Sequence, residues 1–272
     1  AIPSGQKAAD TVTPDPLIRI EHLRTWFTPT AGAEPVKAVD DVSLEIHRGE
    51  VLGLVGESGS GKSTLGRSIL RLVPITDGKI TFEDTELSAL EGRSLKQFRH
   101  RMQMIFQDPY ASLNPRMTVY DTLAEPLLLH GLVRKADLDR AIRELMENVG
   151  LARAFVRKYP HEFSGGQRQR IAIGRALATR PEFIVADEPV SALDVTIQAQ
   201  ILDLLADLTK EYGLTMLFIS HDLAVIRQIA DRIAVMYHGK LVEEGSTAQV
   251  FKMPQQDYTR SLLAAIPGAN AA

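Results

Sequence analysis

The chain has 272 residues, a length that suits one α/β unit with an inserted subdomain and a substantial buried core. Its 31 Lys and Arg residues nearly balance its 34 Asp and Glu residues, so the formal net charge of -3 gives no basic field that favours nucleic acid. The absence of cysteine excludes disulfides, thiolate metal sites and cysteine nucleophiles, and it fits a reducing compartment.

Neither a membrane span nor a secretory signal is indicated. No run approaches the roughly 20 apolar residues that cross a bilayer, and the N-terminus lacks a basic stretch followed by an apolar one. We therefore expect a soluble chain that docks onto separate membrane-embedded subunits if it serves a membrane process. The first residue is Ala1, which leaves open a processed end, an artificial end or a piece of a longer polypeptide.

The N-terminal part of the chain is predicted to be rich in strands. Residues 1–16 mix small, polar and proline residues without periodicity, which indicates a flexible tail or linker. A first strand is expected from residue 17, and residues 42–46 alternate apolar and polar side chains as a half-buried strand does. Residues 50–55 are expected to form a short apolar strand that leads into a glycine-rich loop and a helix over residues 62–72.

The middle of the chain is predicted to be helical, from about residue 109 to residue 180. Its clearest helix is amphipathic, because Ile142, Leu145, Met146 and Val149 fall at positions i, i+3, i+4 and i+7. We expect this part to be an inserted helical subdomain.

Strands and helices alternate in the last third of the chain. The expected elements are, in order, a strand at residues 183–186, a helix at 195–212, a strand at 215–219 and a helix at 223–230. Such alternation predicts a parallel sheet. Residues 233–242 are expected to form a closing hairpin that turns at His238 and Gly239, followed by a short helical tail.

Residues 56–63 match the P-loop pattern G-x-x-x-x-G-K-[ST], between a predicted strand and a predicted helix, which is the context that supports this motif. Glycines let successive backbone N–H groups face phosphates, and the start of the helix adds positive potential. Lys62 is expected to reach the β- and γ-phosphates of a nucleotide, and Ser63 to ligate Mg²⁺. The nucleotide-binding residues predicted here are Gly56, Glu57, Ser58, Gly59, Ser60, Gly61, Lys62, Ser63 and Thr64.

A second glycine-containing segment follows about a hundred residues later. Ser164 stands where a helix N-cap is expected, and Gly165 and Gly166 permit close backbone approach to an anion. Together with Gln167, these residues resemble the signature sequence of ABC ATPases, usually Leu-Ser-Gly-Gly-Gln, with Phe163 in place of the leucine. Alone, the segment could be a plain helix-capping turn; its pairing with the P-loop favours a second phosphate site.

An apolar strand over residues 183–186 is followed by two acids, Asp187 and Glu188. The carboxyl end of such a strand is where a Walker B carboxylate holds the Mg²⁺ shell, so Asp187 is predicted to be a metal ligand. Glu188 is then expected to face the γ-phosphate and to act as the general base for the attacking water. Either acid alone could be an acidic strand end or a helix cap.

Three further positions match loops of the ABC ATPase family. Gln107 resembles the Q-loop glutamine, and the resemblance implies a contact with Mg²⁺ or the lytic water and a link to the helical subdomain. Asp194 lies in a segment that resembles the D-loop at the dimer interface, and His221 resembles the switch histidine that holds the γ-phosphate. The predicted catalytic residues are Glu188, His221 and Gln107, and the predicted metal ligands are Ser63, Gln107 and Asp187.

Family members carry an aromatic residue after the first strand that stacks on adenine. Trp26 and Phe27 both occupy this region, and the spacing from Leu23 favours Phe27. An aromatic residue here can equally belong to the core or its rim, so the choice between the two stays open.

The resemblance runs from about residue 17 to residue 267 and includes six ordered motifs. It implies an α/β fold with a P-loop NTPase (RecA-like) core and parallel sheet, an N-terminal antiparallel β subdomain and an inserted α-helical subdomain. The expected division is a tail at 1–16, an ATP-binding core at 17–107 and 181–250, a helical subdomain with the signature at 108–180 and a C-terminal tail at 251–272.

Two segments resemble the ATP-binding subunits of oligopeptide and dipeptide importers: the Q-loop region at residues 106–116 and the late segment at residues 258–267. This resemblance implies an ATPase that powers the import of peptides or similar small solutes. Some members of the subfamily carry a cysteine cluster in a C-terminal extension, and the absence of cysteine excludes an iron–sulfur site of that kind.

The resemblance also implies partners. A signature that is separated from its own P-loop by an inserted subdomain does not easily reach the same nucleotide, so we expect two such domains, identical or not, to close head to tail on two ATP–Mg²⁺. The other expected partners are transmembrane permease subunits and, indirectly, an extracytoplasmic solute-binding protein; nucleic acid is not expected. The expected location is the cytoplasmic face of the inner membrane, as a peripheral subunit.

The main alternative is a soluble ABC ATPase of DNA maintenance or translation. DNA-maintenance members interrupt the motor with a long coiled coil, whereas no sustained heptads separate Lys62 from Ser164. Translation members generally carry two motors in one chain, and this sequence has one. A regulatory module without turnover would lack Glu188 or His221, and both are present. The transported solute, and whether the partner ATPase is identical, a paralogue or fused, stay open.

Overall fold

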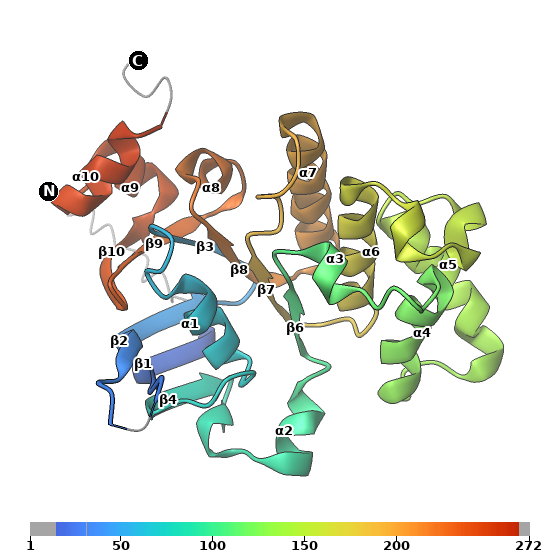
Figure 1. Cartoon of the computed structure of the whole chain (residues 1–272), viewed down its shortest axis with the longest axis horizontal. Helices are drawn as coiled ribbons and strands as arrows, with labels where there is room; N and C mark the ends of the chain where they lie inside the picture. Colours follow the sequence, from blue (N-terminus) through green and yellow to red (C-terminus); the bar gives the residue numbers. More distant parts are fainter. Residues whose placement is uncertain (1–14, 31, 267–272) are drawn as a thin grey trace, which may run out of the picture.

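The computed structural model describes residues 15–30 and 32–266. Most of the predicted tail at residues 1–16 lies outside the described residues, and Pro16 already belongs to the first strand, β1 (Pro16–Phe27). Figure 1 shows a sheet-containing body with a group of helices, α4 to α6, at one end. Among the described residues, no helix is both long and apolar enough to cross a membrane.

The core is a six-stranded sheet with the order β10-β9-β3-β8-β7-β6. Its strands are β3 (Val51–Val55), β6 (Met102–Ile105), β7 (Phe183–Asp187), β8 (Thr215–Ser220), β9 (Arg232–Tyr237) and β10 (Lys240–Ser246). All neighbours pair in parallel except β9 and β10, which form the expected hairpin. Every residue of β3, β7 and β8 is buried, as in a parallel sheet that is covered on both faces.

The N-terminal β subdomain is a separate antiparallel sheet with the order β2-β1-β4-β5. Its other strands are β2 (Val36–His47), β4 (Asp77–Phe82) and β5 (Thr85–Glu86). The apolar side chains of residues 42–46 are buried and alternate with more exposed polar ones, as the sequence predicts. One hydrophobic cluster joins this sheet, helix α1 (Lys62–Ile69) and one face of the core sheet.

The inserted helical part contains α3 (Pro109–Ser112), α4 (Val119–Leu129), α5 (Leu138–Asn148) and α6 (Gly165–Leu177). Short 3-10 turns connect them at Lys135–Asp137, Arg153–Arg157 and Pro160–Glu162. Ile142, Met146 and Val149 are fully buried, and Leu145 is partly buried against the same cluster, so the predicted apolar face is present. That cluster also includes the second face of the core sheet, which fixes the helices against it.

The remaining helices are α2 (Gly92–Phe98), α7 (Val195–Tyr212), α8 (Leu223–Ile229), α9 (Thr247–Lys252) and α10 (Asp257–Ala264), with a 3-10 turn at Leu87–Ala89. The helix predicted over residues 62–72 is shorter than expected: α1 ends at Ile69, and Arg71 adopts left-handed backbone with a φ of 53°. The parallel-sheet core, the antiparallel subdomain and the inserted helices confirm the expected fold class.

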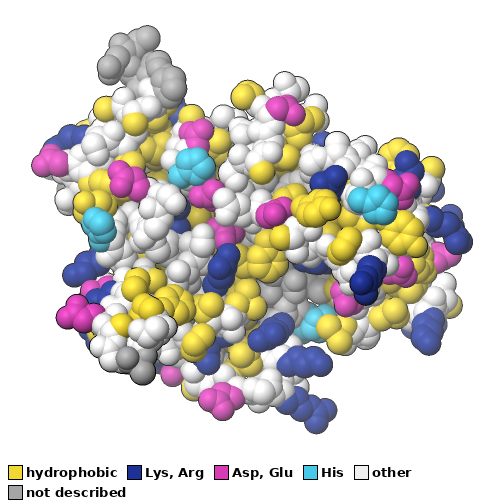
Figure 2. All heavy atoms as spheres, in the orientation of Figure 1, with side chains coloured by type: hydrophobic (Ala, Val, Ile, Leu, Met, Phe, Trp, Pro, Cys, Tyr) yellow, Lys and Arg dark blue, Asp and Glu magenta, His cyan; other side chains and the backbone are white. Residues whose placement is uncertain are grey.

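Figure 2 shows charged side chains of both signs on the drawn face, with several Lys and Arg side chains gathered near its lower edge. This mixture agrees with the nearly balanced composition of the chain.

Candidate active site

The motif residues meet because of the strand order. The P-loop follows β3, His221 follows β8, Glu188 follows β7, and Gln107 comes two residues after β6. These four strands are parallel neighbours in the order β3-β8-β7-β6, so their carboxyl ends lie side by side at one edge of the sheet. An open α/β sheet binds its ligands at this edge.

A pocket of about 740 Å³ lies at this edge. Its lining includes the predicted residues Glu57, Ser58, Gly59, Gly61, Lys62, Ser63, Thr64, Gln107, Glu188 and His221. Gly56, Ser60 and Asp187 are buried and are not among the lining residues. The structure therefore brings the P-loop together with all three residues that the sequence predicts to be catalytic.

Two P-loop glycines cannot be replaced without a clash. Gly61 forms the N-cap of α1 with a φ of 105°, and a Cβ there would lie 2.0 Å from the carbonyl oxygen of Ala38. Gly56 has a φ of 153°, and a Cβ there would lie 2.2 Å from the carbonyl oxygen of Met236. The loop is thus pressed against strands β2 and β9, which leaves its opposite side free to receive phosphates.

Lys62 is held inside the loop. Its side chain is only 4% exposed, and its Nζ donates hydrogen bonds to the carbonyl oxygens of Gly56 at 2.7 Å and Glu57 at 2.8 Å. Burial lowers the pKa of Lys62, although the nearby carboxylates of Glu188 and Asp187 act in the opposite direction. A buried ammonium group that is held by carbonyl oxygens is a ready partner for an anion that enters the loop.

Asp187 and Ser63 form the part of the site that suits a cation. Asp187 is 1% exposed, and its Oδ1 accepts a hydrogen bond from the Ser63 hydroxyl at 2.7 Å. Its Oδ2 has no hydrogen bond within the described residues, with the Arg67 guanidinium 3.6 Å away. Burial raises the pKa of Asp187, a direction that the Ser63 hydrogen bond opposes. A buried carboxylate oxygen without a hydrogen bond, next to the Ser63 hydroxyl, is a suitable ligand for a hard cation such as Mg²⁺.

The protein alone supplies few ligands for such a cation. No group of three or more His, Cys, Asp or Glu residues is arranged to hold a metal ion within the described part of the chain. Mg²⁺ is typically held in nucleotide sites by one or two carboxylates together with substrate phosphates and waters. The donor set of Ser63, Asp187 and Gln107 therefore fits Mg²⁺ that arrives with a nucleotide.

Glu188 is held between side chains from two different loops. Its Oε2 accepts a hydrogen bond from Gln107 Nε2 at 2.9 Å, and its Oε1 lies 3.2 Å from His221 Nδ1. Its backbone is left-handed, with a φ of 46°, and its N–H donates to the carbonyl oxygen of Ile219 at 3.0 Å. Such backbone is costly for a residue other than glycine and is found preferentially at functional sites.

The signature residues lie elsewhere. Ser164 caps α6 in a capping box, in which its Oγ accepts from Gln167 N–H at 3.4 Å and its N–H donates to Gln167 Oε1 at 3.1 Å. Gly166 permits close packing, because a Cβ there would lie 2.4 Å from Ile197. Of the residues that line the pocket, none belongs to the signature. The helix-cap interpretation thus accounts for the Ser164 side chain within this chain, and the predicted phosphate contact of the signature stays a prediction.

Asp194 also lies away from the pocket lining. It is the N-cap of α7, and its Oδ1 accepts a hydrogen bond from Ile197 N–H at 3.0 Å. Its predicted role at a dimer interface stays a prediction.

Phe27 stays a prediction as well. It is 39% exposed at the end of β1 and pairs with Val36, which lines the pocket, but Phe27 itself does not. Trp26 lies beneath Lys37, whose Nζ is 4.7 Å from the centroid of the Trp26 ring. Neither aromatic residue lines the pocket, so the choice between them stays open.

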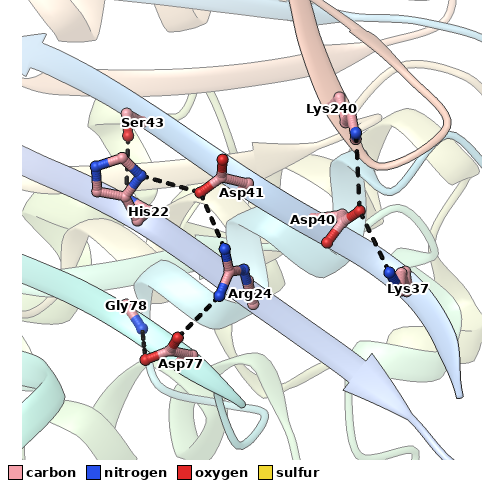
Figure 3. Close-up of polar contacts among 9 residues, drawn as sticks. All are labelled: His22, Arg24, Lys37, Asp40, Asp41, Ser43, Asp77, Gly78 and Lys240. Atoms are coloured by element: carbon pink, nitrogen blue, oxygen red, sulfur yellow. Dashed lines mark hydrogen bonds and ion pairs between the residues drawn. The ribbon is translucent and has the colours of Figure 1, made fainter.

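The sequence prediction missed several lining residues. Lys37 of β2, His238 and Gly239 of the β9–β10 turn and Leu262 of α10 all line the pocket. Figure 3 shows how β2 meets this turn: Asp40 lies between Lys37 and Lys240, with Nζ–Oδ2 distances of 3.9 Å to each. No sequence pattern signals that these residues share a pocket, because elements far apart in the chain, β2, the β9–β10 turn and α10, meet there only in the folded structure.

Comparison with known proteins identifies the family. Residues 39–191 match the family model described as ABC transporter. The chain is 56% identical over 253 residues to the oligopeptide transport ATP-binding protein OppF of Bacillus subtilis (strain 168), covering 92% of this chain and 82% of the relative. It is 51% identical over 256 residues to a putative peptide import ATP-binding protein of Brucella ovis, covering 94% and 80%.

Solved structures agree with this assignment. A dimeric ATP-binding cassette in a post-hydrolysis state, bound to ADP and Pi, has a TM-score of 0.77 at 30% identity and covers 85% of this chain and 98% of its own. CbiO1 of Clostridium perfringens, part of the cbiONQ ABC transporter complex, has a TM-score of 0.76 at 25% identity and covers 93% and 96%. The chain therefore belongs to the ABC transporter family, as one of its ATP-binding ATPase subunits.

Proposed function

We propose that this chain is the motor subunit of an importer for peptides or similar small solutes. The observation that carries the motor function is the position of Glu188, which lies in the P-loop pocket between Gln107 and His221. The import of peptides is supported by the printed names of relatives that are 51% to 57% identical. These names favour import over the alternative of a soluble ATPase in translation or DNA maintenance.

In this proposal the P-loop binds the phosphates of ATP. Backbone N–H groups of the loop and the start of α1 face the phosphates, and the Lys62 ammonium pairs with the β- and γ-phosphate oxygens. Ser63, Asp187 and Gln107 would hold Mg²⁺. When bound, the cation supplies charge neutralisation at the phosphates.

Glu188 orients the attacking water and accepts its proton, and His221 holds the γ-phosphate. Gln107 and His221 both contact the Glu188 carboxylate, and all three residues line the pocket. An incoming γ-phosphate competes with Glu188 for the imidazole of His221. Nucleotide binding is thereby linked to release of the carboxylate toward the water.

The signature acts on the nucleotide of a second ATPase domain. The position of Ser164 and its neighbours supports this, because among the described residues they lie outside the lining of the pocket that contains Lys62. Two domains that close head to tail would complete two ATP sites, with Asp194 near the contact between them. A solved relative of this fold is a dimer with ADP and Pi, which supports the arrangement.

The other proposed partners are transmembrane permease subunits and, through them, an extracytoplasmic solute-binding protein. The chain would act as a peripheral subunit at the cytoplasmic face of the inner membrane. Closing and reopening of the ATPase pair would be transmitted through Gln107 and the helical part at residues 108–180 to the permease.

A mild-detergent pull-down of the tagged chain from its native cells tests the proposal, with the untagged chain as control and mass spectrometry as readout. Recovery of multi-span membrane proteins together with a peptide-binding protein is expected. Recovery of ribosomes or DNA-repair factors without membrane proteins would overturn the transport function and leave the ATPase site intact.

A further inference from the structure

Helix α10 packs directly against the P-loop. The hydroxyl oxygen of Tyr258 accepts a hydrogen bond from the backbone N–H of Glu57 at 3.0 Å. Four residues later, on the same side of the helix, Leu262 lines the pocket. These two residues belong to the segment at 258–267, whose resemblance to importer subunits gives it no chemical role. The C-terminal helix therefore contacts the nucleotide pocket through a polar and an apolar group.

The peptide groups on either side of Glu57 are both engaged. Its N–H donates to Tyr258, and its carbonyl oxygen accepts from Lys62 Nζ at 2.8 Å. A shift of this residue would displace an acceptor of the buried ammonium group that the phosphates need. Tyr258 is thus one residue removed, through the backbone of Glu57, from the main phosphate-binding side chain.

The Tyr258 ring has a fixed position of its own. It packs against Tyr237 at the end of β9, with ring centroids 4.2 Å apart. The start of α10 is held by Glu243 of β10, whose carboxylate oxygens accept from the N–H groups of Gln255 at 2.7 Å and Gln256 at 3.0 Å. Figure 1 shows α10 beside β10 at this end of the molecule. Both strands that support the helix belong to the core sheet.

The P-loop has a second support on the same side. The N–H of Gly239, in the β9–β10 turn, donates to the carbonyl oxygen of Ser60 at 2.9 Å, and the carbonyl oxygen of Gly239 accepts from Asp40 N–H at 2.8 Å. This contact holds the later part of the loop, and the Tyr258 contact holds its beginning. The two contacts come from different elements, so the Tyr258 hydroxyl can be removed while the other support stays.

We propose that Tyr258 is a positioning residue for ATP binding: its hydroxyl holds the beginning of the P-loop and makes α10 a structural part of the nucleotide pocket. The inference rests on the P-loop as the ATP site. Burial raises the pKa of Tyr258, so the phenol stays neutral throughout the physiological range, and its oxygen accepts the hydrogen bond from Glu57 N–H.

The test is Tyr258→Phe, which keeps the ring and removes the hydroxyl. The matched control is Tyr212→Phe, since the Tyr212 hydroxyl accepts a hydrogen bond from Asn148 and Tyr212 does not line the pocket. The readouts are calorimetric affinity for ATP with Mg²⁺, kcat and KM of hydrolysis, thermal stability, and amide hydrogen exchange of the peptide that contains Glu57.

Loss of one hydrogen bond of ordinary strength predicts ATP affinity about three- to tenfold weaker for Tyr258→Phe. KM is expected to rise in parallel while kcat stays within about twofold, and the Glu57 amide is expected to exchange faster. Tyr212→Phe is expected to change none of these values.

Unchanged affinity of Tyr258→Phe overturns the inference, whether or not amide exchange changes. A proportional fall in kcat and thermal stability without a rise in KM also overturns it, because the tyrosine would then act on folding alone. Lys62→Ala in the same calorimetric assay keeps the two proposals separate. If Lys62→Ala binds ATP normally, the P-loop site itself is wrong; if it does not, a negative result for Tyr258 concerns Tyr258 only.

Discussion

The Glu188 carboxylate contacts Gln107 and His221. Both side chains can also form a hydrogen bond with the uncharged amide of a glutamine at this position. Glu188→Gln should therefore keep the local structure and ATP binding while it removes the proton acceptor. We expect hydrolysis to fall by about 10²- to 10⁴-fold, the usual contribution of a general base. The rate of phosphate release measures hydrolysis, and the affinity for ATP measures binding. Glu211→Gln, an exposed substitution on α7, is the control, and wild-type turnover by Glu188→Gln would contradict the assignment.

Gly61 and Gly59 allow a steric effect to be separated from a conformational one. Both have positive φ, at 105° and 80°, but a Cβ at Gly61 would meet Ala38 at 2.0 Å, whereas Gly59 has nothing within 4 Å. Gly59→Ala is expected to cost about 1–3 kcal/mol of unfolding free energy from backbone strain. Gly61→Ala is expected to cost clearly more. Urea unfolding of the nucleotide-free variants measures both, and equal losses would show that the contact with β2 relaxes freely.

At the scale of the element, Glu243 determines how firmly α10 is attached. Burial alone would raise the pKa of Glu243, but hydrogen bonds, including those from the N–H groups of Gln255 and Gln256, together with the nearby charge of Arg260 outweigh it, so the pKa lies below its usual value. A carboxyl group with a lowered pKa in the folded state contributes stability above its unfolded pKa, and this stability is lost as the pH falls through the folded value.

Glu243→Gln is therefore expected to lower the stability of α10 at neutral pH, by about 1 kcal/mol or less, as for a weakened helix cap. The difference from the wild-type chain is expected to disappear in acid, below the folded pKa of Glu243. Amide exchange of residues 255–264 and urea unfolding across the acid range measure this difference in stability. A difference that is equally large in acid would mean that charge at Glu243 is not what holds the helix.

At the scale of the whole molecule, the position of the signature predicts which site a mutation damages. A chain with Ser164→Arg should bind ATP normally as a monomer, because its own P-loop pocket does not include Ser164. In mixed dimers with a wild-type chain, hydrolysis should fail at the wild-type chain's P-loop, since that site would receive the altered signature. Glu188→Gln in one or the other chain identifies the site that still turns over. Damage confined to the mutated chain's own P-loop would contradict the head-to-tail arrangement.

The elements most accurately predicted from sequence are those with strong local signals. Helix α7 runs from Val195 to Tyr212 as expected, because Asp194 caps its start and Gly213, with left-handed backbone, caps its end. The region of residues 73–101 gave no such signal. Its strand β4 inserts beside β1, a pairing between segments far apart in the chain that periodicity cannot indicate.

The residues of the site also divide into those that a short local motif predicts and those that only tertiary packing brings to the pocket. The P-loop, the two acids after β7 and the signature are recognisable because each is a short run whose chemistry depends on adjacent residues. Leu262 and Lys37 were missed because they reach the pocket only through the docking of α10 and the approach of β2. The Tyr258 hydrogen bond to Glu57 spans 201 residues of sequence, a separation at which no local pattern operates.

The sequence by itself determined the nucleotide chemistry and much of the order of the elements, since short motifs and side-chain periodicity depend on residues that are near one another in the chain. Only the tertiary structure decided which loops share a pocket. The parallel order β3-β8-β7-β6 brings the P-loop, His221, Glu188 and Gln107 to one edge, and the packing of α6 against α7 keeps Ser164 away from it. Strand order and helix packing depend on how apolar faces far apart in the chain fit together, and that fit is set by three-dimensional shape.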